Sequence, residues 1–80
     1  MELDKGTVFG GKYFKGKVKV LSVDNDNNIL SVELTLPLNC KDESGNERFS
    51  IWCENWNLEH TIWGIEGGDY YEKDFSNYPV

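Results

Sequence analysis

Apolar and polar residues alternate along two stretches in the first half of the chain. Residues 15–23 read KGKVKVLSV, which places lysines on one side of an extended backbone and valines on the other. Residues 29–36 read ILSVELTL and have the same period of two. This period is typical of half-buried β-strands. The adjacent apolar residues Val20 and Leu21 interrupt the alternation, which indicates a β-bulge or a change of face in the first strand.

Turn-forming residues bound these strands. Residues 24–28, DNDNN, predict a turn, because Asn and Asp tolerate left-handed backbone angles and hydrogen-bond to their own chain. Pro37 predicts the end of the second strand. The polar residues 39–47 include a Gly-Asn pair and predict a loop at the tip of a hairpin.

A third strand is predicted over residues 48–54, RFSIWCE. Its alternation places Phe49, Ile51 and Cys53 on one side, and we expect that side to face the core. Cys53 is then a small buried hydrophobic residue. Trp52 falls on the other, polar side, so we expect its ring to be exposed.

The segment that follows fits two kinds of structure. Residues 56–63, WNLEHTIW, alternate as a strand does, but their apolar residues also fit the spacing of a short helix. We prefer the strand, because Thr, Ile and Trp favour extended structure and Gly64 closes the segment. Residues 67–69 then predict a turn, and Tyr70 and Tyr71 a short last strand.

Five short strands without a long helix predict an all-β fold. A small sheet with one apolar face can cover that face by curling into a barrel. We therefore expect a small five-stranded barrel, SH3-like in preference to OB-like, because an OB-fold usually inserts a helix that we do not find. The 80 residues contain no linker or repeat and predict a single domain over 1–80, with frayed ends at 1–6 and 75–80.

Charge is distributed unevenly along the chain. The net charge is −6, and the excess of acidic residues lies in the second half. No apolar run is long enough for a membrane span, and the first residues do not resemble a secretion signal. With only two cysteines, we expect free thiols and a cytoplasmic protein that does not bind a membrane.

The residue pattern offers little to metal binding or catalysis. Cys40, Cys53 and His60 are the only soft ligands, and the close Cys pair of a structural zinc site is missing. Residues 24–28 resemble the start of a calcium loop, but Ile29 stands where such a loop needs Gly. His60 has no placed nucleophile or oxyanion donor beside it in the sequence. We expect no metal, no cofactor and no enzymatic activity.

Aromatic and acidic residues gather between positions 52 and 72. A groove of exposed rings with a carboxylate rim suits a basic protein or peptide, through ion pairs and cation–π contacts. We therefore expect a non-catalytic binding module. Alternatively, the rings simply cap the open ends of the barrel. The candidate binding residues are Trp52, Trp56, Trp63, Tyr70, Tyr71, Glu54, Glu59, Glu66 and Asp69.

Two other functions fit parts of the sequence. The acidic half is compatible with a nucleic-acid mimic that inhibits a nucleic-acid-binding enzyme, as small phage or mobile-element proteins do. A second alternative is weak nucleic-acid binding through the strand that carries Lys15, Lys17 and Lys19. Because the chain is acidic, we expect protein rather than nucleic acid as the partner, and a monomer or a weak edge-paired dimer.

Overall fold

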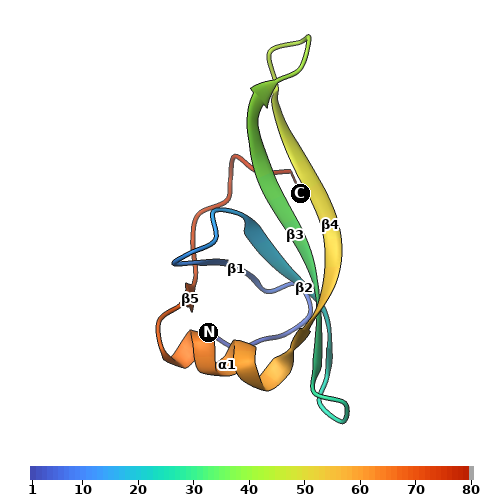
Figure 1. Ribbon diagram of the computed structural model, residues 1–80, viewed down its shortest axis with the longest axis vertical. Helices are drawn as coiled ribbons and strands as arrows, with labels where there is room; N and C mark the ends of the chain where they lie inside the picture. Colours follow the sequence, from blue (N-terminus) through green and yellow to red (C-terminus); the bar gives the residue numbers. More distant parts are fainter. Residues whose placement is uncertain (80) are drawn as a thin grey trace.

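The computed structural model describes residues 1–79 and consists of one antiparallel sheet and one helix (Figure 1). The sheet has five strands in the order β4-β3-β2-β1-β5. It is open, with β4 and β5 as its outer strands, so the predicted β-rich fold is confirmed and the predicted closed barrel is not. The elements are β1 (Val8–Gly11), β2 (Lys17–Asp24), β3 (Ile29–Lys41), β4 (Glu47–Asn57), α1 (Leu58–Glu66) and β5 (Tyr70–Tyr71).

The first hairpin forms as the sequence predicts. Strands β2 and β3 pair in antiparallel register, and the register shifts between Val20 and Ser22, which confirms the predicted bulge. The turn between the strands includes Asn28 in the left-handed conformation, with φ of 57°. The Asp24 side chain accepts a hydrogen bond from the backbone N–H of Asn27, which closes this turn.

Strand β3 continues past Pro37 to Lys41, so the predicted strand end at Pro37 is wrong. The amide of Leu58 donates to the Asn28 carbonyl, and this bond continues the β3–β4 register. Hydrogen-bonded and non-hydrogen-bonded pairs alternate along an antiparallel ladder, so the even-numbered residues of β3 bond to β4. The odd-numbered residues of β3 therefore direct their backbone groups toward β2. Strand β2 starts opposite Thr35, so Pro37 lies beyond it and the missing N–H leaves no ladder bond unmade.

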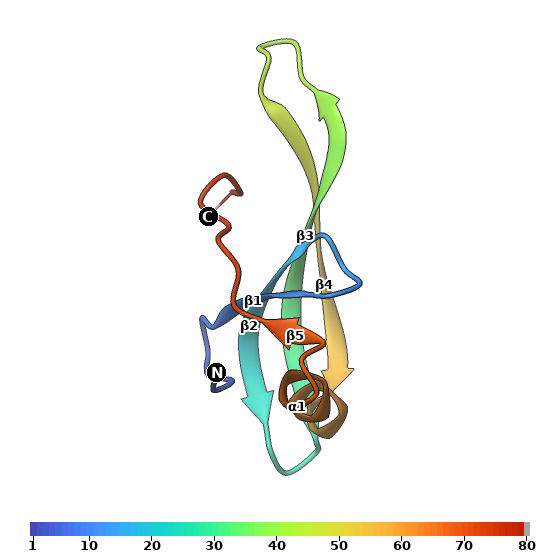
Figure 2. The same ribbon diagram turned by 90° about the vertical axis from the view of Figure 1, so that its left-hand side faces the viewer.

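The core lies on the concave side of the sheet. Strands β1 and β5 and helix α1 lie on the same side of the long β3–β4 hairpin, and α1 crosses the lower end of that side (Figures 1 and 2). Strands β1 to β3 and the first helical residue supply the core side chains. These are Phe9, Val18, Val20, Leu30, Val32, Leu34 and Leu58.

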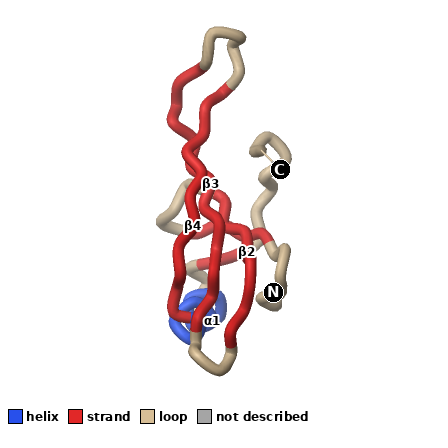
Figure 3. The backbone as a smooth tube through the Cα atoms, turned by 90° about the vertical axis from the view of Figure 1, so that its right-hand side faces the viewer, coloured by secondary structure: helices blue, strands red, loops and turns tan. Residues whose placement is uncertain are grey.

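The upper part of the β3–β4 hairpin extends beyond this core, which makes the molecule elongated (Figure 3). Its principal extents are 45, 22 and 17 Å. The tip is closed by Asp42, whose side chain accepts from the amides of Ser44 and Asn46, each at 2.9 Å. The hairpin loop is therefore shorter than the predicted 39–47, because β3 and β4 both continue into that range.

Residues 58–66 form a helix, so the preferred prediction of a strand over 56–63 is wrong. Two asparagines satisfy the first helical amides. The Asn57 side chain accepts from the His60 amide at 2.9 Å, and the Asn28 side chain accepts from the Glu59 amide at 2.8 Å. Asn57 is thus an N-cap, and Gly67 ends the helix. Leu58 and Thr61 are buried at helical spacing.

Tyr78 and Pro79, within the segment 75–80 that is predicted to fray, contact β4 and the start of β2. The Tyr78 hydroxyl donates to the Lys15 carbonyl at 3.0 Å, and its ring lies 5.1 Å from that of Phe49. The Lys17 ammonium donates to the Pro79 carbonyl at 2.8 Å. Lys17 is only 7% exposed. It therefore does not add to a solvent-exposed lysine surface with Lys15 and Lys19, which the nucleic-acid hypothesis requires.

Removal of the Asn57 side chain should destabilise the fold through the helix. Asn57→Ala should lower the free energy of unfolding by about 1 kcal/mol, because the amide of His60 loses its acceptor. Asn57→Asp keeps a cap acceptor and should retain most of the stability. Urea denaturation followed by circular dichroism measures both variants. Equal stability of Asn57→Ala and wild type would contradict the capping role.

Candidate functional site

Strand β4 carries two tryptophans and a glutamate on the core side of the sheet. Trp52 is paired with Leu34, Glu54 with Val32, and Trp56 with Leu30. Directly paired residues lie on the same face of a sheet. Because those β3 partners belong to the core, the three β4 side chains extend the core face toward the free edge. We call Trp52, Glu54 and Trp56 the Trp-Glu-Trp row.

The predicted orientation of β4 is therefore wrong. Trp52 is half-buried against the core, whereas Ile51 and Cys53 are exposed. The predicted alternation in RFSIWCE is correct. The prediction assigned the wrong face to the core, because it relied on the apolar character of Phe49, Ile51 and Cys53. The register with β3 decides the face instead, and it turns the larger tryptophan rings inward.

The Glu54 carboxylate is held between the two indoles of the row. The Trp52 Nε1–H donates to Oε2 at 2.7 Å, and the Trp56 Nε1–H donates to Oε1 at 3.0 Å. Both bonds stabilise the ionised form of Glu54, and they lower its pKa from the ordinary value of 4.5. The bond from Trp52 has the larger effect, and the bond from Trp56 has the next largest. Glu54 remains exposed, because β4 is an outer strand.

Trp56 connects the row to the last strand. Its ring lies 5.7 Å from the Tyr70 ring, and Phe9 contacts both rings edge-on, at 6.4 Å from Trp56 and 5.5 Å from Tyr70. Gly64 of α1 makes room for Tyr70, since a Cβ at this position would lie 2.6 Å from the tyrosine ring. The aromatic cluster thus depends on the close approach of α1 and β5.

A surface hollow of about 270 Å³ lies beside this cluster, with Trp56 and Tyr70 in its wall. Asn57, His60 and Thr61 complete the wall. The sequence analysis did not place Asn57, His60 or Thr61 in a binding site. A helix assignment for residues 58–66 would have identified them, because helical spacing brings positions 57, 60 and 61 to one end of the helix.

The remaining candidate residues are exposed and lie outside this hollow. Trp63 is 56% exposed, and its ring contacts that of His60 at 5.3 Å. Tyr71 is 42% exposed, with the Lys73 ammonium 5.1 Å from the centre of its ring. Three acidic residues of the helix and the turn after it are also exposed; these are Glu59, Glu66 and Asp69.

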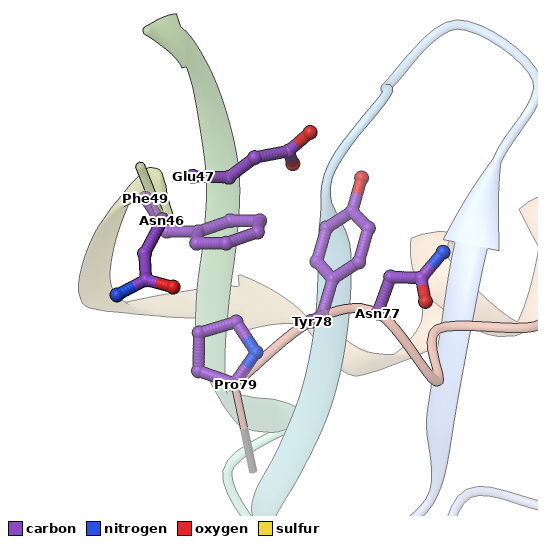
Figure 4. A pocket seen from close by; sticks show the side chains of 6 residues that line it. All are labelled: Asn46, Glu47, Phe49, Asn77, Tyr78 and Pro79. Atoms are coloured by element: carbon purple, nitrogen blue, oxygen red, sulfur yellow. The ribbon is translucent and has the colours of Figure 1, made fainter. Parts of the chain in front are cut away.

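A separate hollow of about 500 Å³ lies where the C-terminal residues meet the hairpin (Figure 4). The rings of Phe49 and Tyr78 lie side by side in its wall, with Pro79 below them. Asn46, Glu47 and Asn77 complete the lining. This hollow was not predicted, because it joins the expected frayed tail to a hairpin that the sequence suggested was shorter.

The described residues contain no group of three or more His, Cys, Asp or Glu side chains that is arranged to hold a metal ion. Within residues 1–79, no helix has the length and apolar character to cross a membrane. Cys40 and Cys53 are both exposed thiols. Around Glu54 the structure places a carboxylate, the two indoles of the row that donate to it and, next to Trp56, the ring of Tyr70. Comparison with protein-family models, curated proteins and solved structures finds no match to this chain.

The pKa of Glu54 should rise when one indole donor is removed. In wild type the folded pKa is lowered, so ionised Glu54 stabilises the fold at neutral pH and this contribution is lost as the pH falls through the lowered value. Trp52→Phe should move the pKa back toward 4.5. The pH dependence of the Glu54 side-chain carboxyl resonance measures the shift. Trp63→Phe, on the helix, is the matched control, and an equal shift in both variants would contradict the assignment.

Proposed function

We propose that this protein is a non-catalytic binding module that docks a basic peptide segment on the Trp-Glu-Trp row and the adjoining hollow. The observation that carries the proposal is the exposed Glu54 carboxylate, which two indole N–H groups hold in a fixed position. A carboxylate fixed in this way offers a preorganised acceptor to a cation, so little side-chain entropy is lost on binding.

The chemistry of the row favours a cation over other ligands. The lowered pKa keeps Glu54 ionised at neutral pH. A carboxylate has about four lone-pair positions, and the two indoles use two of them. A lysine or arginine side chain can take the remaining positions while its alkyl stem lies on the rings of Trp56 and Tyr70. The hollow beside these rings then accommodates the neighbouring part of the peptide.

Charge outside the row supports the same class of partner. The chain has a net charge of −6, and Glu59 is exposed on the helix that forms part of the hollow. A negative surface raises the rate at which a basic segment is encountered and repels a phosphate backbone. We place the function in the cytoplasm, where a reducing environment would keep the exposed Cys40 and Cys53 as thiols.

A labelled peptide of alternating arginine and glycine tests the proposal. Wild type should bind it at low salt, with affinity that falls as salt is added, because the contact with Glu54 is an ion pair. Glu54→Gln and Trp56→Ala should each weaken binding by about tenfold, as expected for loss of a central charged or aromatic contact. Fluorescence anisotropy measures the dissociation constants.

Matched controls come from exposed residues away from the row. Tyr13→Ala removes an exposed ring and Glu43→Gln removes an exposed carboxylate at the hairpin tip, and both should bind the peptide as wild type does. Unchanged affinity in Glu54→Gln would refute the proposed site. Tighter binding of a single-stranded oligonucleotide than of the peptide would refute the proposed class of partner.

A further inference from the structure

Within residues 1–79, strand β4 has a strand partner on one side of its backbone only. It is an outer strand of the sheet and 11 residues long (Figure 3). The bond from the Leu58 amide to the Asn28 carbonyl identifies even-numbered β4 residues as those bonded to β3. The odd-numbered residues between Phe49 and Asn55 therefore direct their N–H and C=O groups away from the sheet. An unpaired row of this kind is a template for another strand.

The same odd-numbered residues form an apolar stripe on the convex face. Phe49, Ile51 and Cys53 follow one another at the spacing of two, on the side opposite the Trp-Glu-Trp row. Ile51 is 52% exposed and Cys53 is exposed. Many outer strands are protected from pairing by charged or proline residues. Residues 49–53, FSIWC, contain neither, and the charged residues of this part of β4 are Arg48 and Glu54, which flank the segment on the other face.

We propose that β4 pairs antiparallel with β4 of a second copy of this chain, with the two Ile51 residues opposite each other on the two-fold axis. In this register Phe49, which is half-buried beside the Tyr78 ring, lies opposite Cys53 of the second copy, so the two apolar stripes adjoin. Ile51, Phe49 and Cys53 are also the residues whose backbone groups face outward, so each of these pairs can exchange ladder hydrogen bonds.

Charge complementarity selects this register. This register places Glu54 of the second copy opposite Arg48 of the first. The two-fold axis generates the same pair again, with Arg48 of the second copy opposite Glu54 of the first. Arg48 is the only arginine of the chain and is exposed. Arg48 and Glu54 are even-numbered, so they form non-hydrogen-bonded pairs, whose side chains are closest. Centring the axis on Phe49 or Cys53 instead would place Arg48 opposite Ser50 or Leu58.

The Glu54 carboxylate can bind the Arg48 guanidinium of a second copy in addition to the two indoles. The indoles of Trp52 and Trp56 use two lone-pair positions of the carboxylate, and a guanidinium can bind the others. The pairing goes beyond the proposed peptide binding. It shares Glu54 with the peptide site, and it places Ser50 of the second copy opposite Trp52 of the row. Ile51 and Arg48 lie outside the hollow that the peptide would occupy.

Two charge reversals test the register directly. Arg48→Glu places two carboxylates opposite each other at both ends of the paired strands, and Glu54→Arg places two guanidiniums there. Each variant should self-associate about tenfold more weakly than wild type, which corresponds to about 1.4 kcal/mol. When the two variants are mixed, a carboxylate again faces a guanidinium at both ends of the paired strands, so the heterodimer should regain the wild-type affinity.

Sedimentation equilibrium measures self-association, and amide spectra of labelled Arg48→Glu, with and without unlabelled Glu54→Arg, detect the heterodimer. Lys5→Glu and Glu43→Arg, at exposed sites away from β4, match the charge changes and should associate as wild type does. Ile51→Lys alters an exposed side chain on the two-fold axis and should be monomeric while keeping the native amide spectrum.

Three outcomes would overturn the proposed pairing. They are a monomeric wild type at about 1 mM, association of Ile51→Lys equal to that of wild type, and a mixture of the charge variants that gains no affinity. The arginine–glycine peptide separates this result from the proposed function. Ile51→Lys should still bind the peptide if the row is a peptide site, whether or not wild type forms a dimer.

Discussion

The pairing of β3 with β4 is the constraint on which the rest of the structure depends. Its register places Trp52, Glu54 and Trp56 opposite core residues of β3, and it brings Asn28 beside the first turn of α1. A shift by one residue would turn Ile51 and Cys53 toward the core and expose both tryptophan rings. The turn before β3 and the cap before α1 lie at the same end of this ladder. Together these two features stabilise the β3–β4 register.

The parts of the fold set by local chemistry were predictable from the sequence. The DNDNN turn, the bulge near Val20 and the strand at Tyr70 and Tyr71 all follow from turn residues or from a period of two. The helix was not predicted, because WNLEHTIW satisfies both periods. The capping pattern favoured the helix, with Asn57 at the N-cap, Glu59 in the first turn and Gly67 after the end.

The candidate site was predictable as a set of residue types but not as a geometry. Nothing in residues 48–54 says which face of an outer strand meets the core, because both faces carry apolar side chains. The register with β3 supplies that information, and it comes from long-range pairing. The contact between Tyr78 and Phe49 has the same origin, since the two residues are distant in sequence and meet only after the hairpin has formed.

Glu54 has opposite effects on two kinds of partner. A charged residue on the inner face of an outer strand discourages pairing with an unrelated strand, because a partner without a cation would leave the carboxylate desolvated and unpaired. The two indoles of the row cannot neutralise its charge. A strand that brings an arginine or lysine to this position removes that penalty and gains a charge-assisted hydrogen bond. The same carboxylate thus excludes most strands and selects cationic ones, whether the cation comes from a peptide or from Arg48 of a second copy.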